Sequence, residues 1–148
     1  MKEDTENKKE FIDGLSVQTK IIFNNLCEKL SNKKFFDDLT LHYHHFPSRK
    51  SYQARIGYKN KIDHKAEYNI ATIDWQPQKN RFKLRMGDKK FAEKIYNDLQ
   101  DKYPIVLKNH EELRIEAYLT NTDEIDSIVD LIIDSASYNS RVGRNKII

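Results

Sequence analysis

The stretch Ile70-Ala-Thr-Ile-Asp-Trp-Gln-Pro-Gln-Lys-Asn-Arg-Phe-Lys-Leu-Arg-Met86 contains two alternating segments joined by a polar turn. Side chains alternate between the two faces of a β-strand, so the second segment has one basic face and one apolar face. The basic face carries Arg81, Lys83 and Arg85, and the apolar face carries Phe82, Leu84 and Met86. In the turn, a proline that cannot donate to a strand ladder precedes an asparagine that tolerates left-handed backbone. We therefore expect a β-hairpin with one buried side and one basic side.

Other periodic segments lie on both sides of this hairpin. Alternation predicts strands over residues 39–46, 52–58, 105–107 and 113–119. Apolar residues at three- and four-residue spacing predict helices over 16–30, 88–99 and from 122 or 123 onward, with Ser16 and Asp88 as N-caps of the first two. Strands joined largely by hairpins, each with one apolar face, predict an α+β fold. We expect a two-layer sandwich of a mostly antiparallel sheet with helices packed on one face.

The length of the chain suits one domain. A chain of 148 residues can bury roughly two-thirds of its unfolded surface. We expect a polar N-terminal lead-in over 1–15, a single α+β domain over 16–139 and a basic C-terminal tail over 140–148. No apolar run approaches the roughly 20 residues that span a bilayer, and the first residues lack a signal-peptide pattern. These features predict a cytoplasmic protein without a membrane partner.

The charge balance permits a polyanionic partner without requiring one. The net charge of +3 arises from 26 basic and 23 acidic residues, so the distribution of charge matters more than its sum. Cys27 is the single cysteine, which excludes an intramolecular disulfide and a multi-cysteine zinc site. Its apolar neighbours favour a small buried hydrophobic side chain over a reactive thiol.

Three predicted strands place basic side chains on the face opposite their apolar residues. Arginine offers a planar fork of donors that suits phosphate, and a neighbouring tyrosine can stack on a base. The alternative is that these charges only solvate the strand exterior and oppose edge-to-edge pairing. The candidate ligand-binding residues are Arg55, Arg81, Lys83, Arg85, Arg114 and Tyr118, beside Gln53 and the acidic Glu116.

The segment Leu41-His-Tyr-His-His45 offers a weaker candidate site. His42 and His44 share one face of a predicted strand and could ligate a metal together. A metal site needs three or four ligands, and nothing in the sequence fixes how far His64 and His110 lie from this pair. We favour surface or hydrogen-bonded histidines and expect no metal or cofactor.

The chain shows no catalytic signature. It has no Gly-x-Ser-x-Gly elbow, and with four glycines it has no phosphate-cradling glycine-rich loop. Asp74, in a strand beside Trp75, is a single carboxylate that cannot form an acid–base pair alone. These absences favour a non-enzymatic protein and leave the question open.

The turn Trp75–Arg81, the late strand Leu113–Leu119 and the closing helix resemble a small uncharacterised bacterial domain. That domain occurs in chains described as predicted transport proteins and at the C-terminal end of restriction-nuclease-like proteins. The resemblance implies a strand, a Gln-Pro-Gln-Lys-like turn, a strand alternating leucine with basic residues, then a late strand and a helix. Where members of the family often carry a Gly-His-Trp-Gly run, this chain has Tyr103-Pro-Ile105 and Lys108-Asn-His110. The family implies no established activity, and its company with nuclease-like domains favours nucleic acid.

Two main functional hypotheses follow, with a metal-assisted enzyme built around His42 and His44 as a weaker third. The first is a non-enzymatic binding domain that engages a phosphate-rich ligand, nucleic acid or nucleotide, on a basic sheet face. The second is a protein-interaction module, an inhibitor or accessory subunit that docks on an acidic partner surface. The sequence leaves the oligomeric state, the strand order and the identity of the ligand open.

Overall fold

A computed structural model describes residues 1–59, 66–109 and 113–138 of the chain. The α-helices in these ranges are α1 (Lys8–Asp13), α2 (Val17–Asn32), α3 (Ala92–Leu99) and α4 (Ile125–Ala136). Short 3-10 helices are η1 (Lys34–Phe36), η2 (Lys89–Phe91) and η3 (Thr122–Glu124). The strands are β1 (Lys2–Glu3), β2 (Thr40–Phe46), β3 (Ser51–Lys59), β4 (Ala66–Gln76), β5 (Arg81–Met86), β6 (Val106–Asn109) and β7 (Leu113–Leu119).

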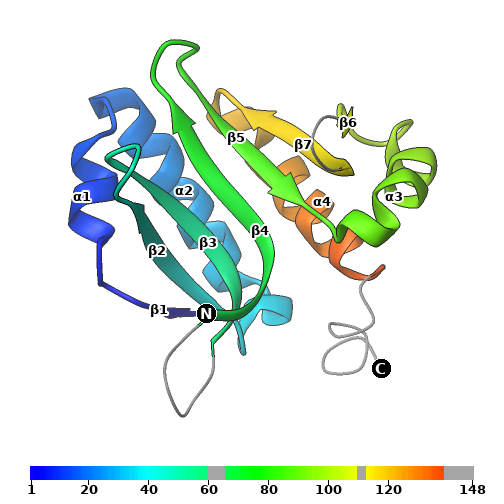
Figure 1. Ribbon diagram of the computed structural model, residues 1–148, viewed down its shortest axis with the longest axis horizontal. Coiled ribbons are helices and arrows are strands. Elements are labelled where there is room, and N and C mark those ends of the chain that lie inside the picture. Colours follow the sequence, from blue (N-terminus) through cyan, green and yellow to red (C-terminus); the bar gives the residue numbers. More distant parts are fainter. Residues whose placement is uncertain (60–65, 110–112, 139–148) are drawn as a thin grey trace.

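The strands form one sheet in the order β1-β2-β3-β4-β5-β7-β6. All neighbouring strands are antiparallel except β1, which pairs in parallel with β2. Helices α1, α2 and α4 cover one face of the sheet, while α3 lies beside β6 and β7 (Figure 1). This architecture confirms the predicted α+β sandwich with a mostly antiparallel sheet.

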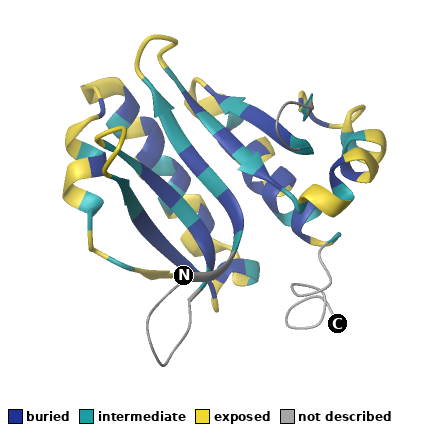
Figure 2. Cartoon of the chain, viewed as in Figure 1, coloured by how far each residue is buried: buried dark blue, intermediate teal, exposed yellow. Residues whose placement is uncertain are grey.

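The β4–β5 hairpin supplies the centre of the core. Ile73 faces Leu84 and Trp75 faces Phe82 across the two strands, and Leu84 and Phe82 are fully buried. The ring of Phe23, on α2, lies 5.8 Å from that of Phe82 and joins the helix layer to the sheet. Figure 2 shows the resulting alternation of buried and partly exposed residues along the strands. The predicted apolar face of β5 is therefore the core face.

The side chains at the helix starts explain where the helices begin. The Ser16 hydroxyl accepts a hydrogen bond from the Thr19 amide at 3.3 Å, as expected of an N-cap. Asp88 accepts a bond from the Lys90 amide and starts η2, which continues into α3. The connection from β7 to α4 is a capping box in η3, built by Asn121 and Glu124.

The segment over residues 1–15 differs from the polar lead-in expected from its composition. It contains β1 and α1, and Phe11 and Leu15 are buried in the core. The Phe11 ring lies 4.9 Å from Phe23 and 5.5 Å from Tyr43. Residues 1–15 contain few apolar side chains among many charged ones, so the sequence shows no clear helical period there. Only the tertiary packing of α1 reveals this helix. The predicted basic tail lies outside the described residues.

Within the described ranges, no helix combines the length and the apolar character required to cross a membrane.

Candidate functional site

The face of the sheet opposite the helices carries a continuous row of polar side chains. We call this surface the open face. Five residues lie directly opposite one another across the neighbouring strands β2, β3, β4, β5 and β7. In this order they are His42, Arg55, Thr72, Arg85 and Glu116. Two arginines therefore flank a threonine, with Glu116 beside the second arginine.

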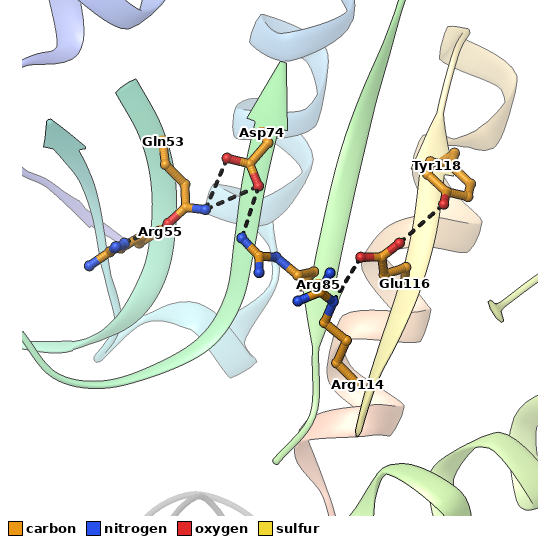
Figure 3. Close-up of polar contacts among 7 residues, drawn as sticks. All are labelled: Gln53, Arg55, Asp74, Arg85, Arg114, Glu116 and Tyr118. Carbon is orange, nitrogen blue, oxygen red and sulfur yellow. Dashed lines mark hydrogen bonds and ion pairs between the residues drawn. The ribbon is translucent and has the colours of Figure 1, made fainter. Parts of the chain in front are cut away.

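A chain of hydrogen bonds links the two arginines of this row. The Nε atom of Arg55 donates to the Gln53 side-chain oxygen at 2.7 Å, and the Gln53 amide donates to both oxygens of Asp74 at 3.0 Å. The same carboxylate lies 3.4 Å from Nη2 of Arg85 (Figure 3). Asp74, on β4, thus accepts hydrogen bonds from side chains of both neighbouring strands, β3 and β5.

A second carboxylate lies on the open face at β7. Glu116 is only 2% exposed, and it accepts hydrogen bonds from Nε of Arg114 at 2.9 Å and from the Tyr118 hydroxyl at 3.1 Å (Figure 3). Burial raises the pKa of the Tyr118 hydroxyl, and the neighbouring carboxylate raises it further. Tyr118 therefore stays protonated and acts as a donor to Glu116.

Arg81 closes the far end of the open face. Its guanidinium lies over the Tyr118 ring, 3.7 Å from the centroid, and its Nε donates to the Gln76 side-chain oxygen at 2.9 Å. A cation this close to an aromatic ring is attracted by the ring quadrupole. One face of the tyrosine predicted to stack on a base is therefore covered by Arg81.

A hollow of about 510 Å³ opens on this face between the β2–β3 turn and the start of η2. We call it the basic hollow. Its cationic lining residues are Arg49, Arg55, Arg85, Lys89 and Arg114, and no acidic residue is among the described residues that line it. The lining also includes Phe46, Asn69, Thr72, Gly87 and Leu113. The volume falls within the roughly 300–1,000 Å³ typical of small-molecule sites.

Three lining residues contain a buried polar atom with no hydrogen-bond partner among the described residues. They are the amide oxygen of Asn69, the hydroxyl of Thr72 and Nε of Arg85. An unsatisfied buried donor or acceptor costs about 1–3 kcal/mol, and native proteins contain few of them. Three of these atoms belong to residues that line one hollow.

Burial is the main cause of two pKa shifts beside the hollow. Burial lowers the pKa of the Arg55 guanidinium; Asp74 opposes this shift, and Arg85 adds to it. Burial also lowers the pKa of His44, and Arg55, His45 and Arg49 lower it further. The nearby cations therefore act in the same direction as burial at His44, whereas at Arg55 the Asp74 carboxylate opposes it.

Phe46 forms an aromatic rim on the β2 side. The guanidinium of Arg49 lies 4.1 Å from the Phe46 ring centroid and that of Arg55 lies 5.4 Å from it. The His44 ring packs edge-on against the same phenyl ring at 4.5 Å. The hollow thus has a flat apolar wall beside two guanidinium groups.

The structure divides the predicted ligand-binding residues into two groups. Arg55, Arg85 and Arg114 meet at the basic hollow. Arg81 and Tyr118 pair with each other away from it, and Lys83 lies between Asp74 and Tyr118 in the strand register.

Sequence reasoning missed several members of the site. Thr72 could have been found, because alternation from the core residue Ile73 places it on the same face as Arg85. Arg49 and Lys89 lie in a turn and in a 3-10 helix, where no two-residue period assigns a face. A β-bulge between Ile56 and Gly57 changes the register before Asn69 and conceals that residue too.

The histidine candidates do not gather into a metal centre. His42 is buried and His44 half-buried on the same strand. The described part of the chain contains no group of three or more His, Cys, Asp or Glu side chains placed to hold a metal ion. His64 and His110 lie outside the described residues.

Cys27 packs against the core from α2 and is half-buried. Burial raises the pKa of its thiol to about 12; the Glu3 charge adds to this shift, and Lys8 opposes it. Reactive cysteines have a lowered pKa, so this side chain has the character of a small hydrophobic residue.

Comparisons of the chain with protein-family models, with curated proteins and with solved structures gave no match. The resemblance to the small bacterial domain therefore stays a prediction.

Proposed function

We propose that this protein is a small binding domain that engages a phosphate-bearing ligand, a nucleic acid or a nucleotide, on the open face of its sheet. The observation that carries the proposal is the basic hollow, in which five cationic residues converge without an acidic residue in the described lining. Arginine binds phosphate oxygens in pairs through its planar fork of donors. Three such guanidinium groups line the hollow, from Arg55 on β3, Arg85 on β5 and Arg114 on β7.

The arrangement differs from an ordinary solvated strand exterior. Arg55, Arg85 and Arg114 are half-buried, and each makes a polar contact to a Gln, Asp or Glu side chain. Ordering a long cationic side chain costs conformational entropy, which a prearranged site has already lost before the ligand arrives. The closely held guanidinium groups of Arg55 and Arg114 support binding rather than simple solvation.

Fluorescence anisotropy tests the proposal with two probes, a labelled single-stranded oligonucleotide and a labelled adenosine nucleotide. We expect binding of at least one probe that weakens steeply as salt rises, because phosphate contacts release counterions. The variant Arg55→Gln/Arg85→Gln should lose about tenfold or more in affinity, since about 1.4 kcal/mol corresponds to tenfold.

The matched control is Lys33→Gln/Lys34→Gln, which removes the same charge from exposed lysines after α2. It should retain most of the affinity. Thermal unfolding of both variants checks that each is folded. Binding of neither probe, or an equal loss in the control variant, would contradict the proposal.

A further inference from the structure

We propose that the basic hollow selects a terminal phosphate monoester on a carrier that also has a hydroxyl or amino donor, such as a free nucleotide or the phosphorylated end of a strand. This inference rests on the proposed function and makes it more specific. It assigns the phosphate to the three arginines of the hollow and a donor of the ligand to Asn69.

The number of guanidinium groups favours a monoester. Arg55, Arg85 and Arg114 approach the hollow from β3, β5 and β7, respectively. A phosphate monoester has three strong acceptor oxygens and a charge of about −1.5 to −2 at neutral pH. An internal phosphodiester has one charge and two free oxygens, so it would leave one of the three arginines without a comparable partner.

The unpartnered atoms define the other half of the ligand. Nε of Arg85 needs an acceptor, which phosphate supplies. The amide oxygen of Asn69 needs a donor, which the dianion of a phosphate monoester does not have on its phosphoryl group. The Thr72 hydroxyl can donate or accept. A phosphate monoester with a ribose hydroxyl or a base amino group beside it would meet both requirements from two separate positions, whereas inorganic phosphate has only the hydroxyl on its own phosphorus as a donor.

Binding includes a change in side-chain conformation. The three unpartnered atoms are buried from solvent, so a ligand reaches them only after a neighbouring side chain moves. The 3.4 Å contact between Arg85 and Asp74 is the longest in the polar network, so it is the easiest to exchange. Arg85 is therefore the side chain expected to turn from Asp74 toward the phosphate.

The far end of the open face is less suited to a continuing strand. The guanidinium of Arg81 is engaged by the Tyr118 ring and the Gln76 side chain. The covered tyrosine face is not available to stack a second base. The open face therefore favours one phosphorylated unit over a track of several.

Isothermal titration calorimetry tests the inference with three small molecules: adenosine 5′-monophosphate, adenosine and inorganic phosphate. It also uses one oligonucleotide in two forms, with a 5′-phosphate and with a 5′-hydroxyl. We expect the monophosphate to bind about tenfold or more tightly than either adenosine or inorganic phosphate. The 5′-phosphorylated strand should bind better than its 5′-hydroxyl form if strand ends are the source. Binding of the free nucleotide alone identifies the small molecule.

The variant Thr72→Val separates binding from folding. It removes an unpartnered buried hydroxyl while keeping the shape of the side chain, so thermal stability should be unchanged or higher. Affinity for the monophosphate should fall about fivefold. Lys79→Ala, in the exposed β4–β5 turn, is the control and should bind as the unaltered protein does.

Equal binding of the two oligonucleotide forms without binding of the mononucleotide would overturn the inference while leaving the proposed function standing. Failure of every phosphate-bearing probe would overturn both. If Thr72→Val binds the monophosphate as tightly as the unaltered protein does, the Thr72 hydroxyl does not contact the ligand. That result would contradict the placement of the ligand in the hollow.

Discussion

The Nη2 atom of Arg85 lies 3.4 Å from a carboxylate oxygen of Asp74 on the neighbouring strand. Charge-assisted hydrogen bonds between nitrogen and carboxylate oxygen are usually about 2.7–2.9 Å long, so this contact is loose. The same carboxylate accepts both of its closer bonds, at 3.0 Å, from Gln53. Asp74 is thus held more closely by Gln53 than by Arg85, and the proposed binding requires Arg85 to exchange this contact for a ligand.

The substitution Asp74→Asn tests this relationship. It removes a negative charge beside the hollow and leaves a side chain of the same shape, so an anion meets less repulsion and Arg85 has no competing carboxylate. We expect phosphate-bearing ligands to bind about fivefold more tightly in calorimetry. Asp37→Asn is the control, because Asp37 is exposed after η1 and carries the same charge. Weaker binding in Asp74→Asn would show that orienting the arginines matters more than competition for them.

Of the two ion pairs described on the open face, Arg114–Glu116 has the more deeply buried carboxylate. Glu116 is almost fully buried, and removing Arg114 leaves its carboxylate with Tyr118 as its remaining hydrogen-bond donor. Because the Arg114 side chain is itself partly exposed, we expect Arg114→Ala to lower the free energy of unfolding by about 2 kcal/mol, less than for a fully buried pair. Urea denaturation at neutral pH measures the change.

The double variant Arg114→Ala/Glu116→Gln is the companion measurement. The uncharged glutamine in place of Glu116 no longer needs a cationic partner. The double variant should therefore recover more than half of the free energy of unfolding that Arg114→Ala loses. If it is no more stable than Arg114→Ala, the loss comes from packing of the arginine stem rather than from the buried charge.

The hairpin around Pro77 shows why much of the fold could be predicted. Its alternation has a strict two-residue period, and the core residues Phe82 and Leu84 are separated from the basic face in both sequence pattern and structure. The helix at 16–30 was equally predictable because Ser16 caps it. By contrast, α1 is short and charged, so its burial through Phe11 depends on contacts that only the folded sheet provides.

The site was only partly predictable for a related reason. The two-residue alternation of the strands placed Arg55, Arg85 and Arg114 on one face. It could not show that Asp74 contacts Arg85 across two strands, or that Glu116 contacts Arg114 along one strand. Which arginines share a hollow depends on strand order and on the length and direction of each side chain. Neither property is contained in a local pattern.

Gly87 fixes the chain direction at the edge of the hollow. Its backbone φ is +82°, and an added Cβ would lie 2.7 Å from Cδ1 of Ile95 on α3. We expect Gly87→Ala to lower the free energy of unfolding by about 2 kcal/mol, because it adds left-handed backbone strain and forces a core isoleucine to move. Chemical denaturation measures this change.

Gly14→Ala provides the comparison for Gly87. Gly14 has a φ of −76°, and an added Cβ would meet its nearest neighbour at an ordinary 3.5 Å. We expect a change within about 0.5 kcal/mol there. Equal losses at the two glycines would show that the backbone conformation of Gly87 is not the cause.

Glu124 makes the start of α4 sensitive to acid. Burial alone would raise the pKa of its carboxyl, but hydrogen bonds from the Thr120 amide and hydroxyl and from the Asn121 amide outweigh burial and lower the pKa below the ordinary value of 4.5. A pKa that is lower in the folded state contributes stability above the unfolded value, and that contribution is lost as pH falls through the folded value. Glu124→Gln should therefore be less stable by about 1 kcal/mol at pH 7, where the carboxylate makes stronger bonds than the amide. Urea denaturation along a series of decreasing pH should show the difference shrinking below pH 4.5. A difference that stays constant across this range would mean that the capping-box geometry, rather than the charge of Glu124, stabilises the helix start.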